Sequence, residues 1–326
     1  MNFLDSCFPL IAKKNLTGKL TEVRAGAATY LVVKNADGYY AYPQKCPHRG
    51  TDLRFATVQD AGVQCPYHGW KIQTDGKVEH PYGEKVNCSV AVVKLEEHFD
   101  CLWMNRNKLP LPLSPSAHVT FTGAQSIKLS APFHVVLDNF NEGSHTAFVH
   151  RVMGSKESQV KEIDFSWEDR GDHVHVKYLG PQRPNLVYNG PFWKTYLNWD
   201  IHWETYVDPV RMVYHSKWVT RRTGRKWWLE NENVYFLVPC GKEQTWLHAF
   251  TYTEIPRHLR PFSFLIKLFS NALTRNQIVE DEKFYPAISD LPFSFRGLRL
   301  DKFDHPLVAI RKKVDPSYFV GFGEDE

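Results

Sequence analysis

Two short segments in the first third of this chain each place one cysteine and one histidine in a tight turn, and they restrict the fold more than any other feature. The first segment reads Cys46-x-His48 and the second reads Cys65-x-x-His68, with sixteen residues between His48 and Cys65. Two thiolates and two imidazoles form a complete ligand set for a metal centre. The chain must therefore fold so that these two loops meet.

Two kinds of centre use two cysteines and two histidines. A structural zinc site usually takes its cysteines as a pair two to four residues apart, which this chain does not offer. A Rieske cluster holds one iron with two cysteines and the other iron with two histidines. Pro47 and Pro66 follow the cysteines, and Gly50 and Gly69 close the turns. Such residues suit tight loops whose backbone N–H groups reach the bridging sulfides, so the pattern favours the [2Fe–2S] cluster over zinc.

A second group of metal-binding residues follows in a stretch of helical character, Leu137 to Val149. On a helix with about 100° per residue, Asp138, Glu142 and His145 fall within about 60° of one another, whereas His150 lies about 140° from His145. Both histidines reach one metal only if the helix unwinds between them. Two histidines and a carboxylate on one face of Fe(II) leave positions open for O₂ and substrate.

These two motifs resemble those of the Rieske non-haem iron oxygenases, and in particular the oxygenase (alpha) component of the compact homotrimeric demethylases and hydroxylases. The resemblance implies an α+β chain: an N-terminal all-β Rieske [2Fe–2S] domain, then a helix-grip, START-like catalytic domain built on an antiparallel sheet. A Pro- and Ser-rich stretch, Leu109 to Ser116, is the best linker. The expected domains are therefore residues 1–112 and residues 113–326.

The same resemblance assigns roles to individual residues. It implies that the cluster is held by Cys46, His48, Cys65 and His68. It implies that a mononuclear iron is held by His145, His150 and Asp281, although Asp281 has an exposed acidic helix face as its alternative interpretation. Glu142 occupies the position of an acid that links a cluster histidine of one subunit to an iron-ligand histidine of its neighbour. Many relatives have the shorter Asp at this position, where this chain has Glu. The nearby Asp138 therefore remains the alternative for this catalytic role.

The implied activity is monooxygenation, in which O₂ and electrons from NAD(P)H hydroxylate or oxidatively demethylate a small organic substrate. A separate reductase, with a ferredoxin in some relatives, supplies the electrons, and the chain itself has no flavin or nicotinamide fingerprint. Relatives form head-to-tail trimers in which electrons cross between subunits. The alternatives are a ring cis-dihydroxylating dioxygenase, a Rieske electron carrier without oxygenase activity, and a helix-grip ligand-binding module. The substrate stays open.

Composition adds several expectations. A net charge of +4 is too small to indicate nucleic-acid binding, and six scattered cysteines indicate a reducing, cytoplasmic setting. No signal peptide and no membrane-spanning segment are expected. The most apolar stretch, Pro261 to Leu273, is expected to form a buried or half-buried helix, with contact to a membrane surface as the alternative. Aromatic residues are concentrated between Phe192 and Trp246, where they either line a cavity or fill a core.

Overall fold

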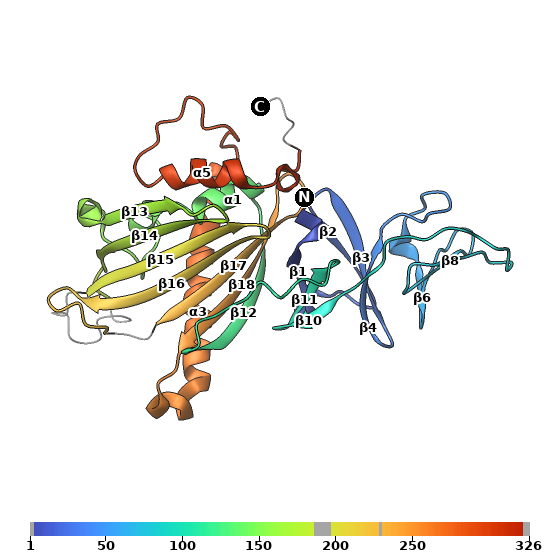
Figure 1. Ribbon diagram of the computed structural model, residues 1–326, viewed down its shortest axis with the longest axis horizontal. Helices are drawn as coiled ribbons and strands as arrows, with labels where there is room; N and C mark the ends of the chain where they lie inside the picture. Colours follow the sequence, from blue (N-terminus) through green and yellow to red (C-terminus); the bar gives the residue numbers. More distant parts are fainter. Residues whose placement is uncertain (1–2, 186–196, 228–229, 322–326) are drawn as a thin grey trace. The chain divides into compact units, whose positions relative to one another are not determined.

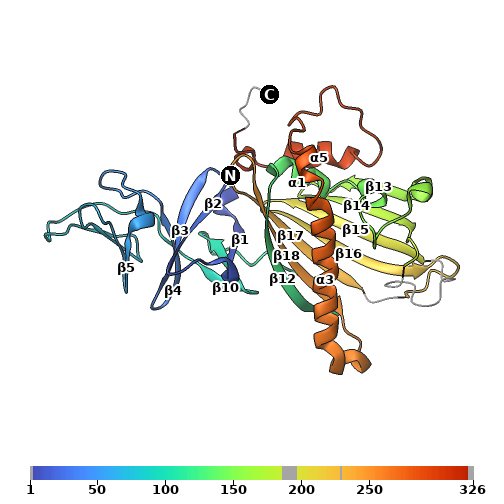
Figure 2. The same cartoon turned by 180° about the vertical axis from the view of Figure 1, so that it is seen from behind.

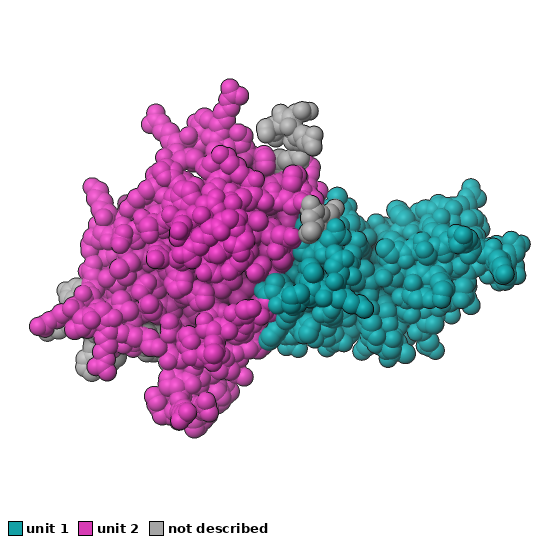
Figure 3. All heavy atoms as spheres, viewed as in Figure 1, with its two compact units in different colours: residues 1–112, 238–241 teal, residues 113–237, 242–326 magenta. Residues whose placement is uncertain are grey.

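The protein is described by a computed structural model that covers residues 3–185, 197–227 and 230–321. It divides into two compact units, coloured separately in Figure 3. Unit 1 comprises Met1–Pro112 and Val238–Gly241, and unit 2 comprises Leu113–Leu237 and Lys242–Glu326. No helix in the described ranges is long and apolar enough to cross a membrane.

Unit 1 is built from short antiparallel strands in three sheets, with the orders β1-β11-β10, β2-β3-β4-β9 and β5-β6-β7-β8. A hairpin with Asp37-Gly38 at its turn joins β3 to β4. The strands are β1 (Cys7–Ala12), β2 (Leu20–Ala25), β3 (Ala28–Asn35), β4 (Gly38–Pro43), β5 (Thr57–Gln59), β6 (Gly62–Gln64), β7 (Lys71–Gln73), β8 (Val78–Glu79), β9 (Val93–Lys94), β10 (Glu96–His98) and β11 (Cys101–Asn105). Short 3-10 turns complete it: η1 (Phe3–Asp5), η2 (Lys13–Asn15) and η3 (Leu53–Phe55).

Unit 2 is organised by a seven-stranded antiparallel sheet of order β12-β18-β17-β16-β15-β14-β13. Burial alternates along β15, as a sheet with one packed face requires, so that Trp199, Ile201 and Trp203 point to the same buried side. The strands are β12 (Val119–Leu129), β13 (Asp164–Asp169), β14 (His173–Pro181), β15 (Leu197–Val207), β16 (Val210–Thr220), β17 (Asn231–Pro239) and β18 (Thr245–Glu254). The α+β class and the antiparallel sheet of the sequence analysis are confirmed.

A long helix, α3 (Ser263–Glu282), runs across one face of this sheet, as Figure 2 shows. It contacts β12 and β18. The remaining elements of unit 2 are α1 (Phe133–Asn139), η4 (His145–Ala147), η5 (Glu157–Glu162), η6 (Arg257–Phe262), α4 (Tyr285–Ile288), α5 (His305–Lys313) and η7 (Pro316–Tyr318). Figure 1 places α1 and α5 near one end of the sheet, away from the free end of α3.

Two expectations about helices need correction. Helical character was expected from Leu137 to Val149, but this expectation is wrong beyond Asn139, where α1 ends. Beyond that point the Phe140 carbonyl accepts from the Tyr214 hydroxyl, and the Ser144 N–H donates to the Glu142 carboxylate. Pro261 to Leu273 is not buried along its length, since Phe264 and Leu268 are 60% and 63% exposed. The first turns of α3 extend beyond the sheet (Figure 1), and the helix is covered by the sheet from Ser270 onward.

Candidate metal centres

The two Cys/His loops of unit 1 have the same backbone structure. In each loop the N–H of the cysteine donates to the carbonyl five residues later, at 2.9 Å for Cys46 and 2.8 Å for Cys65. The N–H of the glycine four residues after the cysteine donates back to the cysteine carbonyl. Gly50 and Gly69 have φ angles of 71° and 72°, a left-handed conformation that favours glycine. The glycines are therefore required by the turn that brings each histidine close to its cysteine.

The four side chains separate into a thiol pair and an imidazole pair. Cys46 and Cys65 are buried and hydrogen-bonded to each other, and this burial raises the pKa of the Cys46 thiol. The rings of His48 and His68 lie 4.8 Å apart. Desolvation and the neighbouring His68 lower the pKa of His48, which favours the neutral imidazole that binds metals. A pair of thiols beside a pair of imidazoles is the donor arrangement that a Rieske cluster needs, with one iron on each pair.

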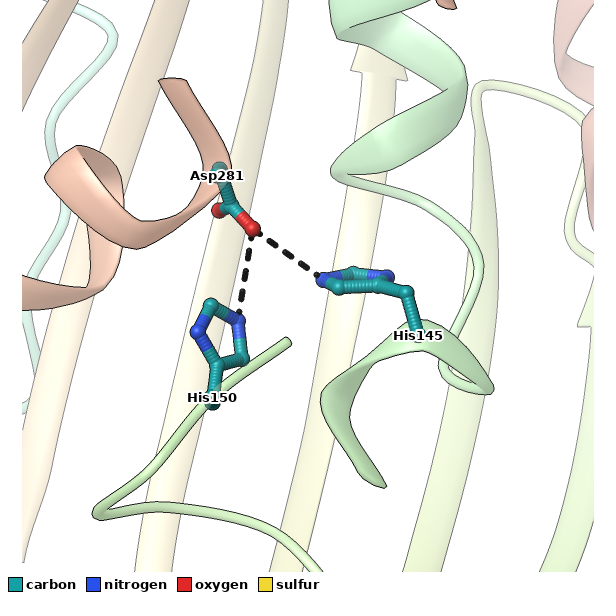
Figure 4. A group of neighbouring side chains, drawn as sticks. All are labelled: His145, His150 and Asp281. Carbon is teal, nitrogen blue, oxygen red and sulfur yellow. Dashed lines mark ion pairs between the residues drawn. The ribbon is translucent and has the colours of Figure 1, made fainter. Parts of the chain in front are cut away.

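A second donor set lies in unit 2, where His145, His150 and Asp281 converge (Figure 4). One ligand atom from each residue lies within 4.8 Å of the other two. The Nε2 atoms of both histidines are 3.5 Å from the same carboxylate oxygen, Oδ1 of Asp281. The three side chains come from three separate places: the turn η4, the segment after it, and the last turn of α3. The helix ends before His145, and between the two histidines the chain forms only the 3-10 turn η4 before it unwinds, as the sequence analysis required.

The carboxylate of Asp281 provides a test of whether a cation fits this site. Asp281 is 7% exposed, and its Oδ1 has no hydrogen-bond partner although it faces two imidazole nitrogens. A buried carboxylate oxygen without a partner is costly unless it is paired with a charge or a metal. Two nitrogens and one oxygen facing a common point are a ligand set suited to Fe(II) with open positions. The residues present therefore fit a bound metal dication.

A carboxylate also contacts the far side of each histidine ring. Oε1 of Glu142 accepts a hydrogen bond from Nδ1 of His145, and Oε2 of Glu280 lies 3.3 Å from Nδ1 of His150. A carboxylate at Nδ1 fixes the ring in the tautomer whose Nε2 is free to bind a metal. Both Nε2 atoms are therefore held toward Asp281. Sequence reasoning missed this role for Glu280, whose only signal was its place beside Asp281.

Charge coupling at this site is strong. Burial alone would raise the pKa of Glu142, but attraction to His145 and hydrogen bonds from His145 and Ser144 lower it to about 2. Burial alone would lower the pKa of His145, but Glu142 and Asp281 raise it to about 10. The two carboxylates thus favour positive charge at His145. A metal dication at Nε2 would supply that charge in place of a proton.

Asp138, the alternative to Glu142, lies elsewhere. Its carboxylate forms a two-point ion pair with the guanidinium of Arg311, in which Nε donates to Oδ1 at 2.9 Å. It contacts neither His145 nor His150 among the described interactions. The helical face that placed Asp138 beside His145 does not exist because α1 ends at Asn139. Of the two candidate acids, only Glu142 touches a histidine of the donor set.

Several polar side chains support the donor set. Tyr285 donates to Asn139 at 3.0 Å, and the buried Asn141 donates to the Leu137 carbonyl at 2.7 Å. Arg183 donates to the carbonyls of Ala147 and Ser155 at 2.8 and 2.7 Å, which closes the segment that carries His150. Sequence reasoning missed these supports because they come from distant elements with no spacing that links them.

A cavity of about 80 Å³ opens beside the donor set. Its walls include the aromatic side chains of Trp199, Trp203, Tyr214 and Tyr235, so part of the aromatic-rich region lines a cavity as well as filling the core. The first residues of that region, 192–196, lie outside the described ranges. The indole N–H groups of Trp199 and Trp203 are buried without a hydrogen-bond partner. No Lys or Arg is among the described lining residues.

Comparison with known proteins agrees with this geometry. The family model of the Rieske [2Fe-2S] domain matches residues 6–91. Chlorophyllide a oxygenase of Oryza sativa is 31% identical over 156 residues, which are 45% of this chain and 26% of that protein. The vanillate O-demethylase oxygenase subunit of a Pseudomonas species is 26% identical over 165 residues, 47% of this chain and 48% of that protein. The chain thus spans about a quarter to a half of these relatives.

Solved structures match over the whole chain. Dicamba monooxygenase bound to 3,6-dichlorosalicylic acid matches with a TM-score of 0.76 over 98% of both chains, at 14% sequence identity. At that identity the match establishes a shared fold, in unit 1 and in unit 2. The chain therefore carries a Rieske [2Fe–2S] domain, and it is similar to oxygenase components of Rieske-type oxygenases in sequence over about half of its length and in fold over nearly all of it.

Proposed function

We propose that this chain is the oxygenase component of a Rieske-type monooxygenase that hydroxylates or oxidatively demethylates a small organic substrate. The observation that carries the proposal is the buried Oδ1 of Asp281, 3.5 Å from Nε2 of both His145 and His150, beside an aromatic cavity. The same chain holds a Rieske domain, which is a source of single electrons. In this proposal residues 1–112 hold the cluster and residues 113–326 hold the mononuclear iron.

Iron bound by three residues on one face supplies open positions for O₂ activation next to the substrate. The residues of the chain do the rest. Glu142 and Glu280 keep both imidazoles oriented toward the metal. The aromatic walls exclude water from the cavity.

The demethylase subunit matched over 47% of this chain supports monooxygenation, whereas a dioxygenase subunit is matched over only 18% of it. The proposed assembly is a homotrimer, in which Glu142 connects His145 to a cluster histidine of the neighbouring subunit. The contact of Glu142 with His145 supports this role, whereas Arg311 engages Asp138. Electrons come from NAD(P)H through a separate reductase, with or without a ferredoxin. We place the protein in the cytoplasm, where its six cysteines remain reduced.

The test is isotopic. The iron-loaded protein is incubated under ¹⁸O₂ with NADH, a surrogate reductase and a panel of methoxylated and N-methylated aromatic compounds. The proposal expects one ¹⁸O atom in the hydroxylated product or in the formaldehyde released by demethylation. Two ¹⁸O atoms in a cis-diol would make the chain a dihydroxylating dioxygenase. If the cluster is reduced but no product carries ¹⁸O with any compound of the panel, and the His145→Ala protein behaves in the same way as the wild type, the chain is an electron carrier.

A further inference from the structure

The side of α3 that faces the sheet is unusually polar for a helix packed on a core. Ser270 and Thr274 are 5% and 4% exposed, at positions where a packed helix normally carries large aliphatic side chains. Their hydroxyls pair with those of Thr253 and Thr251 on β18 at 2.9 and 3.3 Å. Small hydroxyl side chains occupy less volume than Leu or Ile, so this contact between helix and sheet leaves space.

Three cavities follow one another along this side of α3. The first is the 80 Å³ cavity beside Asp281, the second has about 20 Å³, and the third is a groove of about 320 Å³ at the exposed first turns of the helix. The first and second share Gln277 and Asn233 in their walls. The second and third share Leu273, Ser270 and Asn231. The metal-binding cavity is thus continued, through a narrow polar segment, by an outer groove.

The chemistry of the walls changes along this series. The outer groove is lined mainly by aliphatic and aromatic side chains of η6 and α3, among them Leu265, Ile266 and Phe269. The narrow segment is lined by hydroxyl and amide groups. There the buried Oδ1 of Asn231 has no hydrogen-bond partner. An acceptor in that state is satisfied by a hydroxyl or N–H group of a bound molecule.

From these observations we infer that the substrate is an elongated molecule in three parts, and that it enters along α3. Its reacting end lies in the aromatic cavity beside Asp281, a hydroxyl or amide N–H in its middle pairs with Asn231, and an apolar tail occupies the outer groove. This inference rests on the proposed function and specifies its substrate class. The spacing of residues along α3 sets the length of the substrate. Asp281 and Ser270 are eleven residues apart, which is about 16 Å along the helix axis.

The test measures binding, so it does not depend on turnover. The probes are N-alkyl-4-methoxybenzamides with alkyl chains of two to ten carbons, and their Kd values for the iron-loaded protein come from isothermal titration calorimetry. Chains longer than about six carbons extend past Ser270, because the 4-methoxybenzamide and six methylenes together span roughly the distance between Asp281 and Ser270 along the helix axis. Beyond that length we expect the Kd to fall about fourfold for each added methylene that the groove buries.

Three variants locate the tail. Ile266→Lys places a charge in the groove, so it should abolish the dependence on chain length. Leu273→Trp fills the narrow segment, so it should abolish that dependence and also weaken the ethyl probe, whose amide pairs with Asn231 in the same segment. Leu268→Trp is the control, because Leu268 is on the same helix, is 63% exposed and lines none of the three cavities. Melting temperatures establish that each variant is folded. If Leu273→Trp does not fold, Ile266→Lys still decides the test.

A separate experiment tests the contact between the amide N–H of the probe and Asn231. Replacing the amide N–H of the probe by an ester oxygen should weaken binding about tenfold in the wild type and leave Kd unchanged in Asn231→Ala. An equal loss in both proteins would overturn the assignment of Asn231. A Kd that does not vary with chain length in the wild type, or a dependence that survives in both Leu273→Trp and Ile266→Lys, would overturn the route along α3. Absence of ¹⁸O incorporation with intact chain-length dependence would instead overturn the proposed function alone.

Discussion

The two carboxylates that orient the histidines allow a matched pair of substitutions. Glu142→Gln and Glu280→Gln each keep the size of the side chain and remove its charge, one behind His145 and the other behind His150. Each change weakens the hold on one ligand ring. Loss of such a partner typically lowers metal affinity by about 10- to 100-fold. We therefore expect both variants to bind Fe(II) more weakly, by about 1.4–2.7 kcal/mol.

The two variants should differ in turnover. At an iron concentration that saturates both proteins, Glu280→Gln should retain most of its O₂ consumption. Glu142→Gln should lose most of it, because only Glu142 is proposed to connect the iron site to the cluster of the neighbouring subunit. Reduction of the cluster by the reductase should remain normal in both. The block in Glu142→Gln then lies between the two metal centres.

The assay has two stages. Anaerobic competition with a chromophoric chelator gives the Fe(II) affinities, and an oxygen electrode with surrogate reductase gives turnover at saturating iron. Near wild-type turnover in Glu142→Gln would refute the connecting role. Equal loss of turnover in both variants would mean that Glu142 acts only by orienting His145, as Glu280 does for His150.

Three further predictions follow from the same structure. Cys46→Ala or His68→Ala should abolish the visible absorption of the cluster and leave one iron per chain at the second site, measured by metal analysis; loss of both centres would contradict their independence. Arg311→Met leaves Asp138 buried without its partner and should destabilise the fold by about 3 kcal/mol in urea unfolding, with recovery when Asp138→Asn is added; no recovery would refute the ion pair as the cause. Burial lowers the pKa of His248 to about 3. Since the unfolded chain takes up this proton below its usual pKa of about 6.5, stability should fall as pH drops below that value, by about 1.4 kcal/mol per pH unit for this group. The slope of melting temperature between pH 7 and 5 should be shallower in His248→Asn, and an unchanged slope would exclude His248 as a contributor.

The cluster loops could be predicted from the sequence because their chemistry is local. The spacing of Cys46 and His48, and of Cys65 and His68, is set within two turns of five residues, and glycine is required at a positive φ in each. The antiparallel sheet was equally accessible, since strands such as β15 alternate buried and half-buried residues. In the cluster loops and the sheet, the local sequence pattern is therefore sufficient to predict the local structure.

The second metal site was less accessible because tertiary contacts override the local pattern. The helix expected through Glu142 ends at Asn139, where Tyr214 from β16 hydrogen-bonds the Phe140 carbonyl. No pattern in the sequence indicates that a tyrosine 74 residues away contacts this carbonyl. The contact of Glu280 with His150 joins residues 130 positions apart for the same reason. Asp281 was reached only through resemblance to a family, since spacing alone does not select it.

The exposed first turns of α3 show the limit of composition as a guide. The apolar stretch from Pro261 to Leu273 was expected to be buried or half-buried, yet Phe264 and Leu268 face solvent. Hydropathy indicates that a segment can be buried, but it does not indicate how far the sheet that would cover the segment extends. The position of β18 alongside Ser270 and Thr274 decides which residues of the helix are covered.

Metal content is the most direct test of two iron centres in one chain. Iron and acid-labile sulfide are determined for the wild type and for His145→Ala and Asp281→Ala, each reconstituted anaerobically. We predict about three irons and two sulfides per chain in the wild type. We predict about two irons and two sulfides in each variant, with an unchanged rhombic EPR signal from the reduced cluster. Stoichiometric zinc in the wild type, or a cluster that disappears with His145, would contradict the assignment of a Rieske cluster and a separate mononuclear iron.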